Sequence, residues 1–197
     1  MYVDVGCDHG GLPLTLLASG RGGAVIGVDM NAAPCASARE NARRLGLPLD
    51  VRQGDGLAVV EGRVDVVSVC GVGSATVVGV LEGATGRVGA VVAQPNDSAR
   101  LLRGWAREHG WVVERERGLY DRGRYFNTLV LAPGGAGPAD EVELAWGVSA
   151  QVGRAALRQR LASEVERLRG LPGRAAERAV AESAQERLAN ARGADPA

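Results

Sequence analysis

The sequence predicts an α/β fold with a doubly wound parallel sheet, followed by a helical hairpin near the carboxyl end. Short apolar segments rich in β-branched residues alternate with helical segments over residues 1–110, as in a parallel sheet with crossover helices. The first apolar segment breaks into a glycine turn that leads directly into a helix. Beyond a segment rich in glycine and proline at 133–138, two amphipathic helical stripes replace this alternation.

The first strand and its turn lie in the segment VDVGCDHGGLP, residues 3–13. Its alternating valines suit a buried parallel strand. Gly6 and Gly10 let the backbone turn sharply and let a ligand approach it closely. Pro13 suits the first turn of a helix over 12–19, where its missing N–H has no consequence. A strand, a glycine turn and a helix N-terminus in this order predict a nucleotide-binding site.

Acidic side chains around this turn indicate which nucleotide it binds. A dinucleotide site needs glycine at the position of Asp8, where a carboxylate would repel a pyrophosphate. Asp4 adds a second acid, and Asp29 ends the strand 24–30, where doubly wound folds bind ribose hydroxyls. A ligand with an ammonium group and a ribose, such as S-adenosylmethionine, fits these acids better than NAD or FAD. The alternative is a generic α/β turn whose acids are incidental.

The remaining elements follow in chain order. We expect strands over 49–53, 64–70 and 88–93, helices over 33–45, 75–81 and 97–109, and an antiparallel pair of strands over 111–119 and 125–131. Asn31 is the expected N-cap of the helix 33–45, and Gly46 ends it. Five strands separated by helices and followed by a hairpin match the order of methyltransferases rather than that of dehydrogenases.

The domain division follows the change of pattern. We predict a cofactor-binding domain over 1–133, a linker over 134–150 and a helical hairpin over 151–197, with helices at 151–170 and 174–192. Residues 151–197 hold nine arginines against six acids, which suits an arm that contacts nucleic acid; a solvated charged face is an equally good interpretation. Because the first strand begins beside the start of the chain, we expect the helix that usually precedes it to be missing.

Composition restricts the cellular context. The formal net charge is zero, so overall charge neither favours nor excludes nucleic acid as a partner. Three cysteines, an odd number, without a signal peptide indicate reduced thiols and a cytoplasmic location. No apolar run approaches the roughly 20 residues of a membrane span. We therefore expect a cytoplasmic monomer or weak dimer with no membrane or metal partner.

Four separated motifs occur together: DVGCDH at 4–9, RQGDGL at 52–57, GVG at 71–73 and QPN at 94–96. In this order and spacing they resemble the bacterial tRNA (adenine(22)-N1)-methyltransferases, which are class I S-adenosylmethionine-dependent enzymes with a Rossmann-like sheet. The resemblance runs from residue 2 to about 131, and the helical hairpin also looks like that family's C-terminal domain. It implies methyl transfer to N1 of an adenine in the D-loop region of tRNA, at position 22.

Carried over position by position, the resemblance assigns two groups of site residues. Those implied to bind the cofactor are Asp4, Gly6, Asp8, His9, Gly10, Asp29, Met30, Gly54, Asp55, Gly56 and Gly71. Those implied to face the target base are Gly71, Gly73, Gln94, Pro95 and Asn96. Two simpler interpretations stand beside these roles: a loop histidine at position 9 that orients Asp8, and a helix-initiating turn at 94–96 with Asn96 or Asp97 as the N-cap.

The chemistry implied by the resemblance needs orientation more than proton transfer. Adenine N1 already has a lone pair, so the enzyme must hold the base in line and extrude it from its stack. Two positions depart from the family: Gly11 replaces its usual aromatic residue, and Gly71-Val72-Gly73-Ser74 replaces its Gly-Met-Gly-Gly. The alternative functions are a class I methyltransferase acting on another RNA or a small molecule, and a non-catalytic cofactor-binding interaction module.

Overall fold

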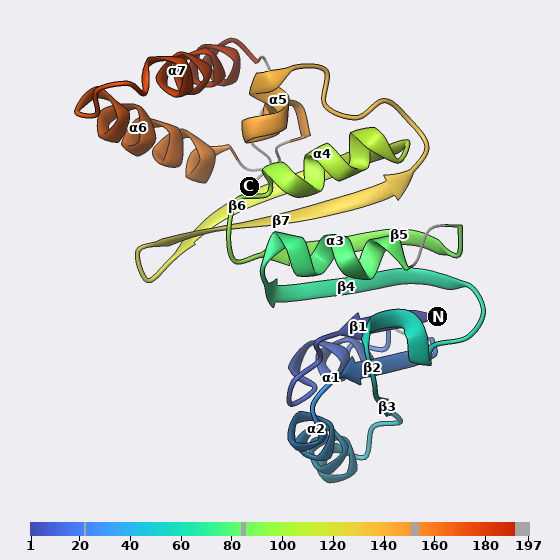
Figure 1. The fold of residues 1–197 in the computed structure, drawn as a ribbon. Coiled ribbons are helices and arrows are strands. Elements are labelled where there is room, and N and C mark those ends of the chain that lie inside the picture. Colours follow the sequence, from blue (N-terminus) through green and yellow to red (C-terminus); the bar gives the residue numbers. More distant parts are fainter. Residues whose placement is uncertain (22, 84–85, 151–153, 192–197) are drawn as a thin grey trace. The chain divides into compact units, whose positions relative to one another are not determined.

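A computed structural model describes residues 1–197 with the exception of 22, 84–85, 151–153 and 192–197 (Figure 1). The chain forms two units, Met1–Pro95 and Asn96–Ala197, each with most of its contacts inside itself. The first unit contains the glycine motif and all of the parallel strands. The second contains the antiparallel strands and the C-terminal helices.

The first unit is a parallel sheet in the strand order β3-β2-β1-β4-β5. Its strands are β1 (Tyr2–Val5), β2 (Val25–Asp29), β3 (Asp50–Gln53), β4 (Val64–Val72) and β5 (Val88–Pro95). Its helices are α1 (Gly11–Ala18), α2 (Ala32–Leu45) and α3 (Ser74–Glu82), with a 3-10 turn, η1 (Gly56–Val59). Helices α1 and α2 pack against β1–β3, and α3 packs against β4 and β5 (Figure 1).

The direction of winding reverses between β1 and β4, which confirms the predicted doubly wound α/β class. Because parallel crossovers are right-handed, the helices before and after this reversal cover opposite faces of the sheet. The central strands are therefore buried on both sides, and Val3, Val28, Val67 and Val91 are fully inaccessible. This burial explains why these strands are continuous apolar runs in the sequence.

Strand β5 is two residues longer than predicted and includes Gln94 and Pro95. Pro95 lies opposite Val72 of β4 at the end of the ladder, where a residue without an N–H is tolerated. The next helix, α4 (Arg100–Glu108), begins three residues later than the predicted start at 97. Its N-cap is Ala99, so the expected cap at Asn96 or Asp97 is wrong.

The second unit is built on an antiparallel pair, β6 (Trp111–Asp121) and β7 (Arg124–Pro133). The two residues between them, Arg122 and Gly123, both have positive φ, at 48° and 77°, which is typical of a two-residue hairpin turn. Helices α4, α5 (Glu141–Trp146), α6 (Ala155–Arg169) and α7 (Ala175–Asn190) complete the unit, with a 3-10 turn, η2 (Val148–Ala150).

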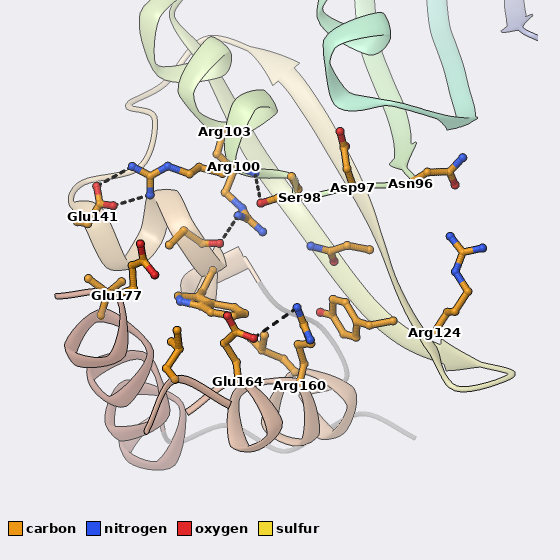
Figure 2. Close-up of a pocket in the computed structure, with 18 of the residues that line it drawn as sticks. Asn96, Asp97, Ser98, Arg100, Arg103, Arg124, Glu141, Arg160, Glu164 and Glu177 are labelled. Atoms are coloured by element: carbon orange, nitrogen blue, oxygen red, sulfur yellow. Dashed lines mark hydrogen bonds and ion pairs between the residues drawn. The ribbon is translucent and has the colours of Figure 1, made fainter. Parts of the chain in front are cut away.

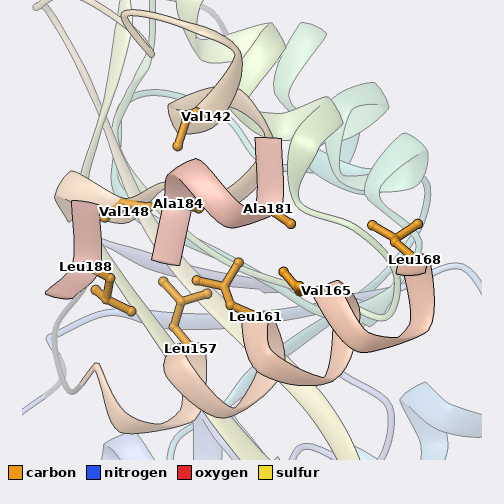
Figure 3. Packing of buried hydrophobic residues seen from close by; sticks show 9 residues of the cluster. All are labelled: Val142, Val148, Leu157, Leu161, Val165, Leu168, Ala181, Ala184 and Leu188. Carbon is orange, nitrogen blue, oxygen red and sulfur yellow. The ribbon is translucent and has the colours of Figure 1, made fainter. Parts of the chain in front are cut away.

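Helices α6 and α7 form the predicted hairpin and share one apolar core (Figure 3). The buried residues of this core are Val142, Val148, Leu157, Leu161, Val165, Leu168, Ala181, Ala184 and Leu188. The predicted helix ends at 151–153 and 192 lie outside the described residues. Two members, Val142 and Val148, come from the segment 134–150, so this segment is not only a linker but also part of the helical core. The division of the chain into a cofactor-binding domain, a linker and a helical hairpin stays a prediction.

A buried ion pair connects α4, α5 and β6. The Arg103 guanidinium of α4 binds the Glu116 carboxylate of β6, and both side chains are almost inaccessible. Its Nη1 also donates to the carbonyl oxygens of Leu144 (3.1 Å) and Ala145 (2.8 Å) in the last turn of α5. One buried arginine thus provides hydrogen-bond donors both to two carbonyl groups at the end of α5 and to the carboxylate on β6.

Within the described ranges, no helix has the length and apolar character needed to cross a membrane. The same part of the chain contains no group of histidine, cysteine and acidic side chains arranged to hold a metal ion.

Candidate functional site

The candidate site lies at the carboxyl edge of the parallel sheet in the first unit. Strands β1 and β2 and the segments that follow β1, β2 and β3 carry all but one of the residues predicted to bind the cofactor; the exception is Gly71 of β4. The ends of β4 and β5 carry most of the residues predicted to face the target base. Parallel strands end at the same edge, and ligands of open α/β sheets bind where the winding reverses. The fold therefore brings both groups to one edge, beside the reversal between β1 and β4.

The turn after β1 has left-handed backbone at three alternating positions. Gly6, Asp8 and Gly10 have φ of 76°, 49° and 83°. Glycine favours this conformation, and aspartate is among the few other residues that tolerate it. Asp8 therefore occupies, in backbone terms, the place of the second glycine of a dinucleotide turn. A side chain at Gly10 would also lie 3.2 Å from Leu14 and 3.3 Å from Ala38, so α1 and α2 pack closely at this point.

Asp29, at the end of β2, holds the glycine turn by hydrogen bonds. Its Oδ2 accepts the backbone N–H of Asp8 (3.1 Å), and its Oδ1 accepts the backbone N–H of Asn31 (2.9 Å). The Asn31 side-chain amide also donates to Oδ1 (3.3 Å). The Asp29 carboxylate is therefore fixed in orientation at the strand end, where a ribose hydroxyl could donate to its remaining lone pairs.

Asp4 is buried in the middle of the sheet between Gly27 of β2 and Ser68 of β4. The Ser68 hydroxyl donates to Asp4 Oδ1, and the Tyr2 hydroxyl donates to Ser68 Oγ (2.6 Å). Burial raises the pKa of Asp4 to about 6, while the hydrogen bond from Ser68 acts in the opposite direction. Sequence reasoning missed Tyr2 and Ser68, although a serine inside the apolar run 64–70 was a visible signal.

His9 and Asp8 form an exposed pair, with His9 Nδ1 2.8 Å from Asp8 Oδ2. The His9 carbonyl accepts the side-chain amide of Asn41 (2.9 Å), which ties the turn to α2. A pocket of about 250 Å³ opens beside these residues, and Gly11 is part of its wall. A Cβ at Gly11 would lie 3.3 Å from the His9 ring, so the missing aromatic leaves this wall open.

The segment after β3 approaches the end of β2 through its backbone. The N–H of Gly54 donates to the Asp29 carbonyl (2.9 Å), and the side chain of Gln53 donates to the Met30 carbonyl (3.2 Å). Met30 is 65% exposed. Asp55 follows as the N-cap of η1, and Gly56 begins this turn with φ 53°.

The residues predicted to face the target base lie at the ends of β4 and β5. Gly71 forms an irregularity in the ladder with φ 75°, next to the pairing of Cys70 with Gln94. Gly73 is the N-cap of α3. The structure thus brings Gly71, Gly73, Gln94 and Pro95 to one edge, while Asn96 is the exposed first residue of the second unit.

The amide of Gln94 is turned toward its own strand end. Its Nε2 donates to the Pro95 carbonyl (2.8 Å). Nearby thiols are protonated, because burial raises the pKa of Cys70 to about 11 and that of Cys7 to about 12. The edge therefore offers amide and backbone groups to a base and no reactive thiolate.

Comparisons with known proteins identify the family. The model of the tRNA (adenine(22)-N(1))-methyltransferases matches residues 2–191. A Streptococcus pneumoniae protein described as a putative tRNA (m1A22) methyltransferase is 26% identical; the match covers 96% of this chain and 90% of that one, with a TM-score of 0.82. A structure of that protein in complex with S-adenosyl-L-methionine gives 26% identity, coverages of 95% and 90%, and a TM-score of 0.79.

M. capricolum TrmK in complex with S-adenosyl-homocysteine shares the fold, at 20% identity, coverages of 95% and 88%, and a TM-score of 0.80. No curated relative matches the chain. The family match spans nearly all of the sequence and confirms the family, the enzyme class and the methyl donor that the motifs predicted. This chain belongs to the tRNA (adenine(22)-N(1))-methyltransferase family, whose activity is the S-adenosylmethionine-dependent methylation of an adenine in tRNA.

Proposed function

We propose that this chain methylates N1 of adenine 22 in tRNA at the carboxyl edge of its parallel sheet. The observation that carries the proposal is the arrangement around Asp29, whose carboxylate fixes the glycine turn while standing at the ribose position of a doubly wound fold. The family match over residues 2–191 supports the same activity.

The residues at this edge fit S-adenosylmethionine, which when bound supplies an electrophilic methyl group on a sulfonium. Asp29 accepts the ribose hydroxyls, and Met30 together with Gly54, Asp55 and Gly56 surrounds the adenine. The turn Gly6–Gly10 receives the methionine end. Backbone hydrogen bonds hold this turn in place: the N–H groups of Gly6 and Cys7 donate to the Val28 carbonyl at 2.8 and 3.0 Å.

Asp4 and the Asp8–His9 pair supply negative charge at the methionine end. The exposed Asp8 carboxylate can approach an ammonium directly, with His9 holding one of its oxygens. The buried Asp4 acts through the field of its carboxylate, which a nearby positive charge keeps ionised. An NAD pyrophosphate would meet the same two carboxylates and be repelled.

The target base is oriented by neutral groups. Gln94 and Asn96 present side-chain amides, and the backbone around Gly71 and Gly73 presents N–H and carbonyl groups. An amide that now bonds its neighbour's carbonyl can exchange this partner for the edge of adenine at small cost. No general base is needed, because adenine N1 carries its own lone pair. The residues accelerate the reaction by positioning.

The hairpin α6–α7 is the proposed contact for the tRNA backbone, since it carries most of the arginines of the C-terminal segment. Phosphate contacts of this kind position the RNA without reading its sequence. A tRNA substrate and three unpaired cysteines support a cytoplasmic location. A monomeric or weakly dimeric state remains a prediction.

The experiment is a methyl-transfer assay with unmodified tRNA transcript, followed by nucleoside mass spectrometry and mapping of the modified position. We expect 1-methyladenosine at position 22. Gln94→Ala should lower the single-turnover rate by about ten-fold or more, the loss of one oriented contact. A matched control, run at saturating S-adenosylmethionine, is Gln53→Ala, which removes an amide at the end of β3, the far strand of the parallel sheet, that is not proposed to face the base. Methylation at another atom or of another substrate class would overturn the proposal.

A further inference from the structure

A cavity of about 740 Å³ lies within the second unit. Its walls come from β7, from α4 and α5, and from both helices of the hairpin (Figure 2). Asn96 and Asp97 stand at one side of this cavity, and Glu177 at another (Figure 2). Its volume lies within the range of small-molecule sites, so it can hold a group the size of a nucleoside.

Two residues that line this cavity, Tyr125 and Asn127, each carry a buried polar atom that lacks a hydrogen-bond partner among the described residues: Tyr125 Oη and Asn127 Oδ1. They belong to alternate residues of β7, so both side chains leave the same face of the strand. Asn127 is only 8% exposed. Its Nδ2 donates to Glu116, a carboxylate that only accepts, which fixes the amide with Oδ1 left over. An unpaired buried acceptor is unfavourable and indicates a group that donates to it.

Most of the charged groups around the cavity have opposite partners within the unit, and its lining holds four arginines and four acids. Arg103 binds Glu116, and Arg100 forms a two-point ion pair with Glu141. Farther along the wall, Arg160 lies 3.8 Å from Glu164. These pairs neutralise one another, so the cavity attracts a neutral ligand more than an ionic one. Tyr125 and Trp146 add aromatic surface to the apolar part of the lining.

We propose that this cavity receives an unstacked nucleobase of the tRNA, from a nucleotide that flanks the methylated adenosine. A nucleobase is neutral and flat, and its exocyclic amino group can donate to Asn127 Oδ1 while its ring lies against an aromatic side chain. The inference rests on the proposed function, because Asn96 is proposed to face the target base and also lines this cavity. Asn96 and the cavity both belong to the second unit, so a nucleotide next to a base that contacts Asn96 reaches the cavity.

The first test fills the cavity without disturbing the buried ion pair. Ala176 of α7 is exposed and lines the cavity, whereas Ala179 is exposed on the same helix and does not line it. Ala176→Phe should weaken binding of unmodified tRNA to the full chain by about ten-fold, the value of one base stack. Ala179→Phe should bind like the wild type. Both should retain their affinity for S-adenosylhomocysteine, which reports on the first unit.

A second pair removes one hydroxyl. Tyr125→Phe deletes the unpaired Oη, while Tyr120→Phe deletes the hydroxyl of a neighbouring ring that does not line the cavity. Tyr125→Phe should weaken tRNA binding about three-fold or more and leave thermal stability unchanged or raised, because an unpaired buried group is lost. If Tyr125 served only the fold, Tyr125→Phe would lower thermal stability and leave tRNA binding unchanged. If circular dichroism shows that Ala176→Phe does not fold, the comparison of Tyr125→Phe with Tyr120→Phe tests the inference in its place.

The third measurement locates the base. tRNA transcripts carry 2-aminopurine at either nucleotide flanking the target, and its fluorescence rises when the base unstacks. We expect a rise at one flank with the wild type and Ala179→Phe but not with Ala176→Phe. Equal tRNA affinities and equal fluorescence for both alanine variants would show that only water fills the cavity and would overturn the inference. A wild type that transfers no methyl group to tRNA would instead refute the proposed function.

Discussion

Replacement of Asp29 by alanine tests the cofactor site most directly, because this carboxylate has two roles. It is proposed to bind the ribose of the cofactor, and it accepts two backbone N–H groups and one amide from the turn around it. An acid at a strand end contributes little to the apolar core, so a role in ligand binding alone would leave the fold unchanged. Its three hydrogen bonds show that Asp29→Ala also affects stability.

The size of each effect follows from these contacts. In Asp29→Ala the N–H groups of Asp8 and Asn31 lose a charged acceptor, and each unpaired group costs about 1–3 kcal/mol. Both residues are exposed, so water replaces part of the loss and the net destabilisation should be about 2 kcal/mol. The lost ribose contact should weaken S-adenosylmethionine binding by a further 1–3 kcal/mol, or roughly 5- to 150-fold.

Two measurements separate these effects. Urea unfolding without ligand gives the change in stability, and calorimetric titration at a temperature where the variant is folded gives the dissociation constant. Asn31→Ala is the matched control, because it removes the weakest of the three hydrogen bonds and leaves the carboxylate in place. It should change the dissociation constant less than two-fold. An unchanged affinity in Asp29→Ala, with the expected loss of stability, would show that the ribose binds elsewhere.

Three further predictions concern other parts of the chain. Because burial raises the pKa of Asp4 to about 6, the free energy of unfolding should fall by roughly 1 kcal/mol as pH rises from 5 to 7, and urea titrations of Asp4→Asn should lack this fall. Arg103→Met should destabilise by about 3–5 kcal/mol in guanidinium unfolding, with partial recovery on adding Glu116→Gln. Gly54→Ala would place a Cβ 2.2 Å from Val59; we expect about 1–3 kcal/mol lower stability, restored in thermal melts by adding Val59→Ala.

The sign of the Asp4 prediction follows from its two protonation states. The folded pKa lies above the ordinary value of 3.8, so both states of the chain bind the proton below that value and no stability is lost there. As pH rises toward the folded pKa, the unfolded chain releases its proton first, and folding becomes less favourable. A stability that instead rises with pH across this window, and does so only when Asp4 is present, would mean that the carboxylate is stabilised as an anion.

The positions of the parallel strands along the chain and the identity of the turn could be predicted from the sequence, because both depend on local patterns. Continuous β-branched runs mark strands buried on two faces, and glycine with proline marks the turn and the following helix. Long-range partners carry no such pattern. Ser68 was visible as a polar residue in an apolar strand, but its partners Asp4 and Tyr2 lie more than 60 residues away.

Two elements of the second unit escaped prediction for different reasons. Helix α5 is only six residues long and follows a glycine-rich segment, so no helical period could develop, although Asp140 caps it by accepting two N–H groups. The sequence does not mark Arg103 and Glu116 as buried, because charged residues are rarely found in a core. Their burial depends on a mutual contact between a helix and a strand, and on two carbonyl groups at the end of α5.

The charge of the helical hairpin shows most clearly what a residue count leaves out. Several of its arginines form ion pairs within their own helix: Arg160 and Arg167 with Glu164, Arg169 with Glu166, Arg174 with Glu177, and Arg178 with Glu182. The surface is therefore less positive than its arginine count indicates. Exposed pairs of this kind are worth at most about 1 kcal/mol, whereas each phosphate contact releases a counterion from the RNA. RNA can therefore displace the carboxylates, and until it does the segment 151–197 presents only a small positive excess, nine arginines against six acids.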